Sequence, residues 1–153
     1  MHLALRGKVR EAEAVAVAIR GRYDGKKRNP WNEIECGNNY ARSMASYAML
    51  QAFSGFRYDM SCKMIGFKPQ VSGEFRCFWA LGAAWGLFEV HDGVRQVHLL
   101  HGTLELKRLA LEGTALSINS KEMAALFADG EWHLKKPIKM QPGDCLSVMA
   151  TRS

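Results

Sequence analysis

The N-terminal part of the chain carries the pattern of helices. Residues 8–23 are rich in helix formers, with Glu11 and Glu13 near the start and arginines near the end, where the helix dipole favours each charge. Just before this segment, residues 3–5 lead to Gly7, a spacing typical of a helical turn closed by a glycine in the left-handed conformation. The pattern therefore predicts a short helical stub followed by a full helix.

A second helix is predicted at residues 40–53. Asn38 or Asn39 can cap its start, and Gly55 can close its end. Small and large apolar residues cover nearly every side of this segment. Because a helix that is apolar all round is normally buried all round, we expect it to have neighbours on several sides.

From about residue 60 the periodicity changes to that of strands. Phe75, Cys77 and Trp79 alternate with Arg76, Phe78 and Ala80, as the two faces of a sheet require. Short strands separated by glycine-containing turns indicate an antiparallel, sandwich-like region. The segment at 121–127 fits either a short helix or an edge strand. The further strands are predicted at residues 85–90, 94–100, 103–111, 114–118, 131–135 and 145–149.

Composition narrows the classes of function. The chain has 153 residues, 48% of them hydrophobic, which suffices for a core, and a formal net charge of +6. The basic residues are scattered, and the one compact cluster, residues 26–28, is interpreted as a solvated turn and not as a phosphate site. We therefore expect no nucleic-acid partner.

Membrane and metal signals are also absent from the sequence pattern. No apolar run approaches the roughly 20 residues of a membrane helix, and no secretory signal is recognisable, which predicts a cytoplasmic protein without a transmembrane segment.

His98 and His101 form an HxxH string, but on a regular strand they would face opposite ways. No metal or cofactor is expected. The cysteines form no CxxC pair and are interpreted as free buried thiols: Cys36, Cys62, Cys77 and Cys145.

A distinctive motif lies at residues 30–42, with the pattern Pro-Trp-Asn-Glu-x-Glu-x-Gly-x-x-Tyr-x-Arg. Together with its surroundings at 22–59, it closely resembles the C-terminal part of glycoside hydrolase family 116. That family includes bacterial β-glucosidases and the non-lysosomal glucosylceramidase. The strings KMIGFKPQV and FRCFWALGAAWG resemble the following part of the family more loosely.

The resemblance implies a fold. Catalytic domains of this family are (α/α)6 barrels, so residues 1–59 are expected to be the last helical hairpin of such a barrel, truncated at its N-terminus. Residues 60–153 are expected to form the antiparallel β-rich, sandwich-like C-terminal region. The predicted fold class is therefore α+β.

The resemblance also implies a sugar-binding role for the motif. A glutamate of the motif and the arginine after the tyrosine are expected to bind hydroxyl groups of the sugar, which assigns these roles to Glu33 and Arg42. Glu35 competes with Glu33, because residues two apart on an extended loop point to the same side. An ion pair between Glu33 and Arg42 that fixes the loop is the structural alternative. The full predicted substrate-binding set is Glu33, Arg42, Glu35, Trp31, Asn32 and Tyr40.

No catalytic residue is predicted. A retaining glycosidase needs two carboxyl groups about 5 Å apart on opposite sides of the glycosidic bond. Glu33 and Glu35 would approach the sugar from one side, and the nucleophile and acid/base of the family resembled lie upstream of the motif. We therefore expect the isolated chain not to hydrolyse glycosides.

The sequence thus predicts the C-terminal portion of a retaining β-glucosidase or glucosylceramidase-like hydrolase that contributes glycone-binding residues. Its partners would be a β-glucoside or glucosyl-lipid substrate, bound through the full-length enzyme, and a separately encoded upstream half. Two alternatives stay open: a carbohydrate-binding or accessory β-module, and an inactive remnant of a truncated gene. Trp79, Trp85 and Phe88 could form a sugar-stacking platform, although aromatic residues at this density more often form a core.

Overall fold

The computed structural model describes residues 2–22, 26 and 44–149. The chain divides into two compact units, residues 1–53 and residues 54–153. They are called here the helical unit and the β unit, and each is described by itself. None of the helices in the described part of the chain has both the length and the apolar character that a bilayer crossing requires.

The helical unit contains α1 (His2–Leu5), α2 (Val9–Arg20) and α3 (Met44–Ser54), except that the last residue of α3, Ser54, belongs to the β unit. Gly7 has a φ of 75°, and its N–H donates to the carbonyl of Ala4 at 2.9 Å, so the predicted stub closed by a left-handed glycine is confirmed. Helix α2 lies within the predicted segment. Gly55, with a φ of 59°, follows the end of α3 as expected.

The helix predicted at 40–53 is described from Met44 as α3, and within this chain it is only partly covered. In its described side chains Tyr47 is 66% exposed and Leu50 is also exposed, whereas Ala52 is buried. The core of the helical unit is small and consists of Ala4, Ala12 and Ala52, with Phe53 packed against them. Alanine permits close approach of helices but buries little apolar area, so this core contributes little hydrophobic stabilisation.

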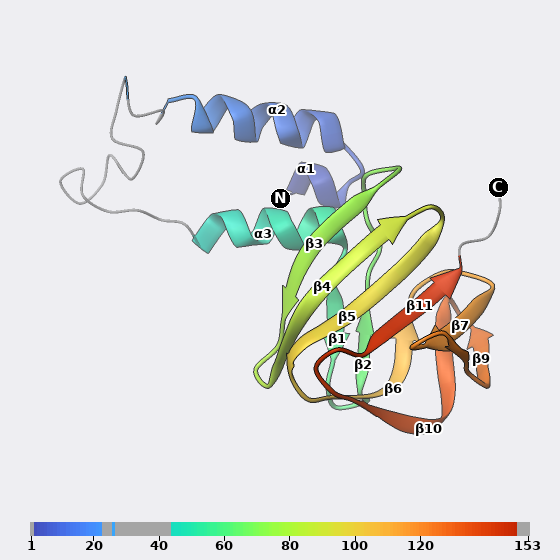
Figure 1. The fold of residues 1–153 in the computed structure, drawn as a ribbon. Helices are drawn as coiled ribbons and strands as arrows, with labels where there is room; N and C mark the ends of the chain where they lie inside the picture. Colours follow the sequence, from blue (N-terminus) through green and yellow to red (C-terminus); the bar gives the residue numbers. More distant parts are fainter. Residues whose placement is uncertain (1, 23–25, 27–43, 150–153) are drawn as a thin grey trace. The chain divides into compact units, whose positions relative to one another are not determined.

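The β unit consists of two sheets that are largely antiparallel (Figure 1). The five-stranded sheet has the order β1-β2-β6-β10-β9, with one parallel pair, β2 with β6. The six-stranded sheet has the order β3-β4-β5-β11-β7-β8. The strands are β1 (Arg57–Asp59), β2 (Met64–Gly66), β3 (Phe75–Ala80), β4 (Ala84–His91), β5 (Val94–Gly102), β6 (Leu104–Ala110), β7 (Ala115–Ile118), β8 (Lys121–Glu122), β9 (Ala125–Ala128), β10 (Glu131–Met140) and β11 (Cys145–Met149).

The predicted fold class is wrong. Strands are the commonest element among the described residues. The three described helices have 4, 12 and 11 residues, which does not amount to a barrel hairpin joined to a sandwich. Helix α2 buries only Ala12, and the described side chains of α3 are partly exposed. The glycines that close α1 and α3 were predicted correctly, and the predicted caps Asn38 and Asn39 lie outside the described residues. Such local signals do not specify how many helices pack together.

Most of the predicted strands are confirmed. Strand β3 alternates as expected, with Cys77 and Trp79 buried and Phe78 exposed. The ambiguous segment at 121–127 contains strands β8 and β9, which belong to different sheets, and no helix. Strands β1 and β2 were not predicted, because three residues are too few to establish a period of two.

Both sheets bury one face in a shared core. The six-stranded sheet contributes Trp79, Phe88 and Leu99, and the five-stranded sheet contributes residues such as Leu106 and Met140. Phe67 stacks on Phe88, with ring centroids 4.1 Å apart and planes 3° from parallel. Burial of these side chains is the main favourable term for the β unit.

A bulge interrupts the pairing of β4 with β5. Trp85 lies opposite His101, but the next residue, Gly86, lies opposite Leu99, so Leu100 has no partner. At this point the two backbones approach closely. A Cβ atom on Gly86 would overlap the carbonyl oxygen of His98 and lie 2.9 Å from Cζ2 of Trp79.

We expect Gly86→Ala to lower the free energy of unfolding by about 1–3 kcal/mol, the usual cost of overpacking a core. Urea unfolding followed by circular dichroism measures this loss. Gly82→Ala is the matched control, because a Cβ there meets no atom within 4 Å. Equal unfolding midpoints for the two variants would contradict the close approach at Gly86.

The exposed apolar side chains of α2 lead to a second prediction. Val15, Val17 and Ile19 are all exposed on this helix. Because exposed apolar side chains favour association, we expect sedimentation to show concentration-dependent self-association. Replacing Val17 and Ile19 by serine should weaken it. A monomer over a wide range of concentrations for the unaltered chain would exclude this prediction.

Candidate functional site

The predicted sugar-binding motif cannot be placed. Its six candidate residues, Trp31, Asn32, Glu33, Glu35, Tyr40 and Arg42, lie outside the described residues. The candidate site among the described residues lies elsewhere, on the outer face of the six-stranded sheet.

Three ring side chains form a strip on that face. Phe78 on β3 and Trp85 on β4 have ring centroids 5.8 Å apart, and Trp85 stacks on His101 of β5 at 5.7 Å with an interplanar angle of 19°. Phe78 is 47% exposed and Trp85 is 40% exposed. These three residues are called the aromatic strip. Large aromatic side chains left in water on a sheet face are typical of a binding surface.

The bulge on β5 explains why His101 belongs to this strip. His98 pairs with Leu87 and His101 pairs with Trp85, and both partners point outward from β4, where the neighbouring Phe88 and Gly86 are buried. His98 and His101 therefore lie on the same face. The prediction that they face opposite ways is wrong, because the extra residue Leu100 shifts the alternation by one position.

A row of polar side chains runs across the same face. Arg76, Glu89, Gln96 and Ser147 occupy successive paired positions on four neighbouring strands. Glu89 accepts from Arg76 Nε at 2.7 Å and lies 3.2 Å from His98 Nε2. Gln96 donates to Ser147 Oγ at 3.4 Å. This row is called the polar row.

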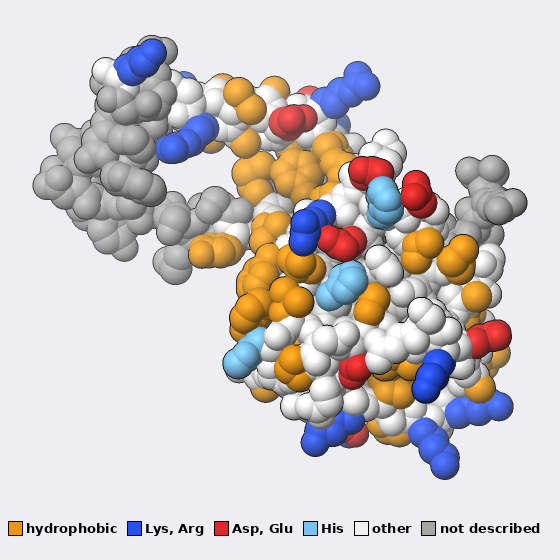
Figure 2. Space-filling model, in the orientation of Figure 1, with side chains coloured by type: hydrophobic (Ala, Val, Ile, Leu, Met, Phe, Trp, Pro, Cys, Tyr) orange, Lys and Arg blue, Asp and Glu red, His pale blue; other side chains and the backbone are white. Residues whose placement is uncertain are grey.

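The polar row adjoins a shallow cleft of about 340 Å³, which is lined in part by Arg76, Glu89, Gln96 and His91. Figure 2 looks onto this side of the β unit. Apolar side chains gather along the margin where β3 and β4 lie, and charged and histidine side chains lie across the middle. The face therefore combines flat aromatic surface with hydrogen-bonding groups of both kinds, donors and acceptors.

Cys145, His98 and Glu89 superficially resemble a nucleophile, its base and an orienting carboxylate. Cys145 Sγ is 4.0 Å from His98 Nε2, and Glu89 contacts that same nitrogen at 3.2 Å. In a working triad the carboxylate binds the other ring nitrogen. Burial also raises the pKa of the Cys145 thiol above its ordinary value, which disfavours the thiolate. This group is therefore not a nucleophilic site.

One group of described side chains has the composition of a metal site. Glu74, His91 and Asp92 offer ligand atoms within 4.8 Å of one another, and all three are exposed. His91 contacts Glu74 through Nδ1 at 2.8 Å and Asp92 through Nε2 at 3.2 Å. Because the carboxylates bind opposite nitrogens of one ring, a single ion at either nitrogen would require one carboxylate to move. The arrangement is explained as surface ion pairing.

The three residues of the predicted sugar-stacking platform, Trp79, Trp85 and Phe88, do not lie on one surface. Trp79 and Phe88 are core residues, as expected from aromatic density, whereas Trp85 is exposed. Phe78, which stands beside Trp85, was not selected from the sequence. Its signal was present in the alternation of β3, which places Phe78 on the face opposite Cys77 and Trp79.

No protein-family model matches the chain, and no curated protein matches its sequence. The resemblance of residues 22–59 to glycoside hydrolase family 116 therefore stays a prediction.

Proposed function

We propose that the β unit is an accessory module that binds carbohydrate on the outer face of the six-stranded sheet. The observation that carries this proposal is the exposed aromatic strip beside the polar row. The strip extends across three neighbouring strands, so it offers a surface longer than one side chain.

The chemistry of sugars explains why this combination suits them. A pyranose ring has an apolar C–H face and a rim of hydroxyl groups that donate and accept hydrogen bonds. Phe78 and Trp85 provide flat apolar area for the C–H face. Arg76 provides donors and Glu89 acceptors at the adjacent positions, and these charged groups form stronger hydrogen bonds than neutral ones.

The sequence motif narrows the class of sugar. Because residues 22–59 resemble a family of β-glucosidases and glucosylceramidases, β-linked glucosides are the ligands that we propose for this face. The module would hold such a substrate near an enzyme active site and would not cleave it. The polar row contains a single carboxylate, Glu89, whereas glycoside hydrolysis requires two.

A second candidate function rests on the motif itself. In this proposal the chain is the C-terminal portion of a retaining β-glucosidase-like hydrolase, and Glu33 and Arg42 bind the glycone of a β-glucoside or glucosyl lipid. The two proposals place the ligand at different residues of the same chain, so point variants of the full chain distinguish them.

We expect the full chain to bind cello-oligosaccharides, with Trp85→Ala weakening the affinity about tenfold or more. A tenfold loss corresponds to about 1.4 kcal/mol, within the range for removal of a central aromatic contact. Isothermal titration calorimetry with glucose and with longer β-glucans measures this effect. Tyr58→Ala is the matched control, because Tyr58 is also exposed but lies on β1 of the other sheet.

Glu33→Gln and Arg42→Gln complete the comparison. If these changes abolish binding and Trp85→Ala leaves it unchanged, the motif carries the function and the aromatic strip does not. If the full chain binds no β-glucan at any accessible concentration, the proposal for the β unit fails.

We also expect the isolated chain not to hydrolyse a chromogenic β-glucoside, because no nucleophile or acid/base is predicted in it. Release of the chromophore is measured for the unaltered chain and for Glu33→Gln. Turnover above that of the variant would contradict the assignment of the chain as a non-catalytic portion.

A further inference from the structure

A second cleft, of about 590 Å³, lies on the five-stranded sheet and is separate from the aromatic strip. The cleft is formed by an irregularity in the pairing of β10 with β6. Between His133 and Ile138 this strand advances five positions, whereas its partner β6 advances two, from Arg108 to Leu106. The extra residues, which include Pro137, arch away from β6 and leave a hollow beside the start of β2.

The lining of this cleft is basic. Lys63, Lys107, Arg108 and His133 all line it, and no acidic side chain does so among the described residues. We call it the basic cleft. Such a concentration of cations attracts anions and raises their rate of encounter with the site.

Acidic residues stand at the margin and neutralise part of this charge. Lys63 Nζ is 2.7 Å from Glu105, and Arg108 Nη1 is 3.5 Å from Glu131. Within the described part of the chain, Lys107 and His133 have no carboxylate within ion-pair distance. Lys107 is therefore a cation of the cleft whose charge is not offset by an ion pair among the described residues.

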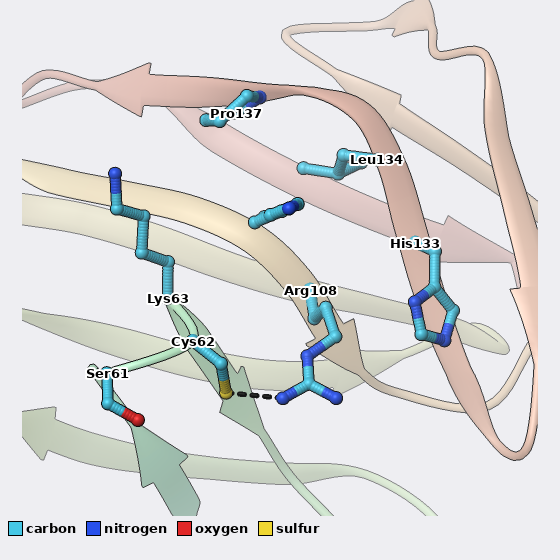
Figure 3. A pocket seen from close by; sticks show the side chains of 8 residues that line it. Ser61, Cys62, Lys63, Arg108, His133, Leu134 and Pro137 are labelled. Atoms are coloured by element: carbon cyan, nitrogen blue, oxygen red, sulfur yellow. Dashed lines mark hydrogen bonds between the residues drawn. The ribbon is translucent and has the colours of Figure 1, made fainter.

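A cysteine thiol faces into this charge. Figure 3 shows Cys62 and Arg108 pointing toward each other, and Arg108 Nη2 donates a hydrogen bond to Cys62 Sγ. The thiol in turn donates to the carbonyl oxygen of Asp59 at 3.4 Å. The Asp59 carboxylate also lies beside the thiol, and hydrogen bonds from Ser61 and Cys62 lower the pKa of Asp59. The hydrogen bond to Cys62 raises the pKa of Arg108 above its ordinary value, so the guanidinium is charged at all ordinary pH values. The guanidinium and the thiol thus meet at the wall of the cleft.

Burial affects the thiols of the other two described cysteines. Burial raises the pKa of Cys77 to about 11, and it also raises the pKa of Cys145. Cys77 is fully buried, whereas Cys62 is partly exposed. Cys62 is thus the described thiol that combines access, a cationic neighbour and an adjacent cavity.

We propose that the basic cleft binds small anionic disulfides and that Cys62 undergoes thiol–disulfide exchange with them. The Cys62 thiolate attacks one sulfur of the bound disulfide. A bond forms between Cys62 Sγ and that sulfur as the disulfide bond of the ligand breaks, and the other half leaves as a thiolate that takes up a proton from solvent. No further oxidant is needed, because the disulfide itself is reduced.

Three small disulfides of different charge test this proposal on the full chain: oxidised glutathione, which is anionic, hydroxyethyl disulfide, which is neutral, and cystamine, which is cationic. Mass spectrometry with peptide mapping follows the mixed disulfide at each cysteine. At each cysteine the rate of reaction with oxidised glutathione is divided by the rate with cystamine. We expect this ratio to be about tenfold or more higher at Cys62 than at Cys145, because local charge changes encounter rates by such factors. The preference should fall as salt is added.

Lys107→Gln should reduce the preference of Cys62 for the anionic disulfide without changing its reaction with the neutral one. Lys121→Gln, the same change at an exposed site on β8 of the other sheet, is the matched control. Cys36 is replaced by serine in all variants, so that its reaction does not consume reagent. Equal charge ratios at Cys62 and Cys145, or reaction of Cys145 before Cys62, would overturn the proposal. If Lys107→Gln misfolds, the proposal is still tested by the effect of salt on the preference of Cys62 in the chain with Lys107 unchanged.

Discussion

Burial of one face of each sheet in a common core is the constraint on which the rest of the β unit depends. Trp79 and Phe88 are fully buried from one sheet, and residues such as Leu106 fill the space from the other. Because neighbouring residues on a strand point to opposite faces, this burial commits Phe78 and Leu87 to the outside. The surface chemistry of the β unit is thus a consequence of what its core requires.

Two irregularities in strand pairing change which side chains reach the surface, and each lies at a candidate site. The bulge at Leu100 brings His101 to the face that carries Trp85, and the arch of β10 between His133 and Ile138 opens the basic cleft. Bulges commonly redirect side chains in this way. In both places the regular sheet supplies rigid support, and the irregular residues create the feature that a ligand could use.

Where the basic residues gather is decided by the folded structure and not by their order in the sequence. Along the sequence the basic residues look scattered, and this pattern is typical of a solvated surface. In the structure, Lys107 of β6, His133 of β10 and Lys63 of the turn before β2 line one cleft. The aromatic strip likewise joins residues 78, 85 and 101, which no short motif would connect. Sites assembled across a sheet leave no compact signature in the sequence.

The sequence by itself determined the local elements: the left-handed turn at Gly7, the extents of most strands, and the outward position of Phe78, all of which follow from propensity and periodicity over a few residues. It failed where long-range packing decides the outcome. The barrel hairpin expected at residues 1–59 was wrong, because a helical pattern does not specify which neighbours a helix has. The common face of His98 and His101 and the meeting of Cys62 with Arg108 depended on strand register. Only the tertiary structure fixes that register, since it results from the simultaneous burial of both sheets.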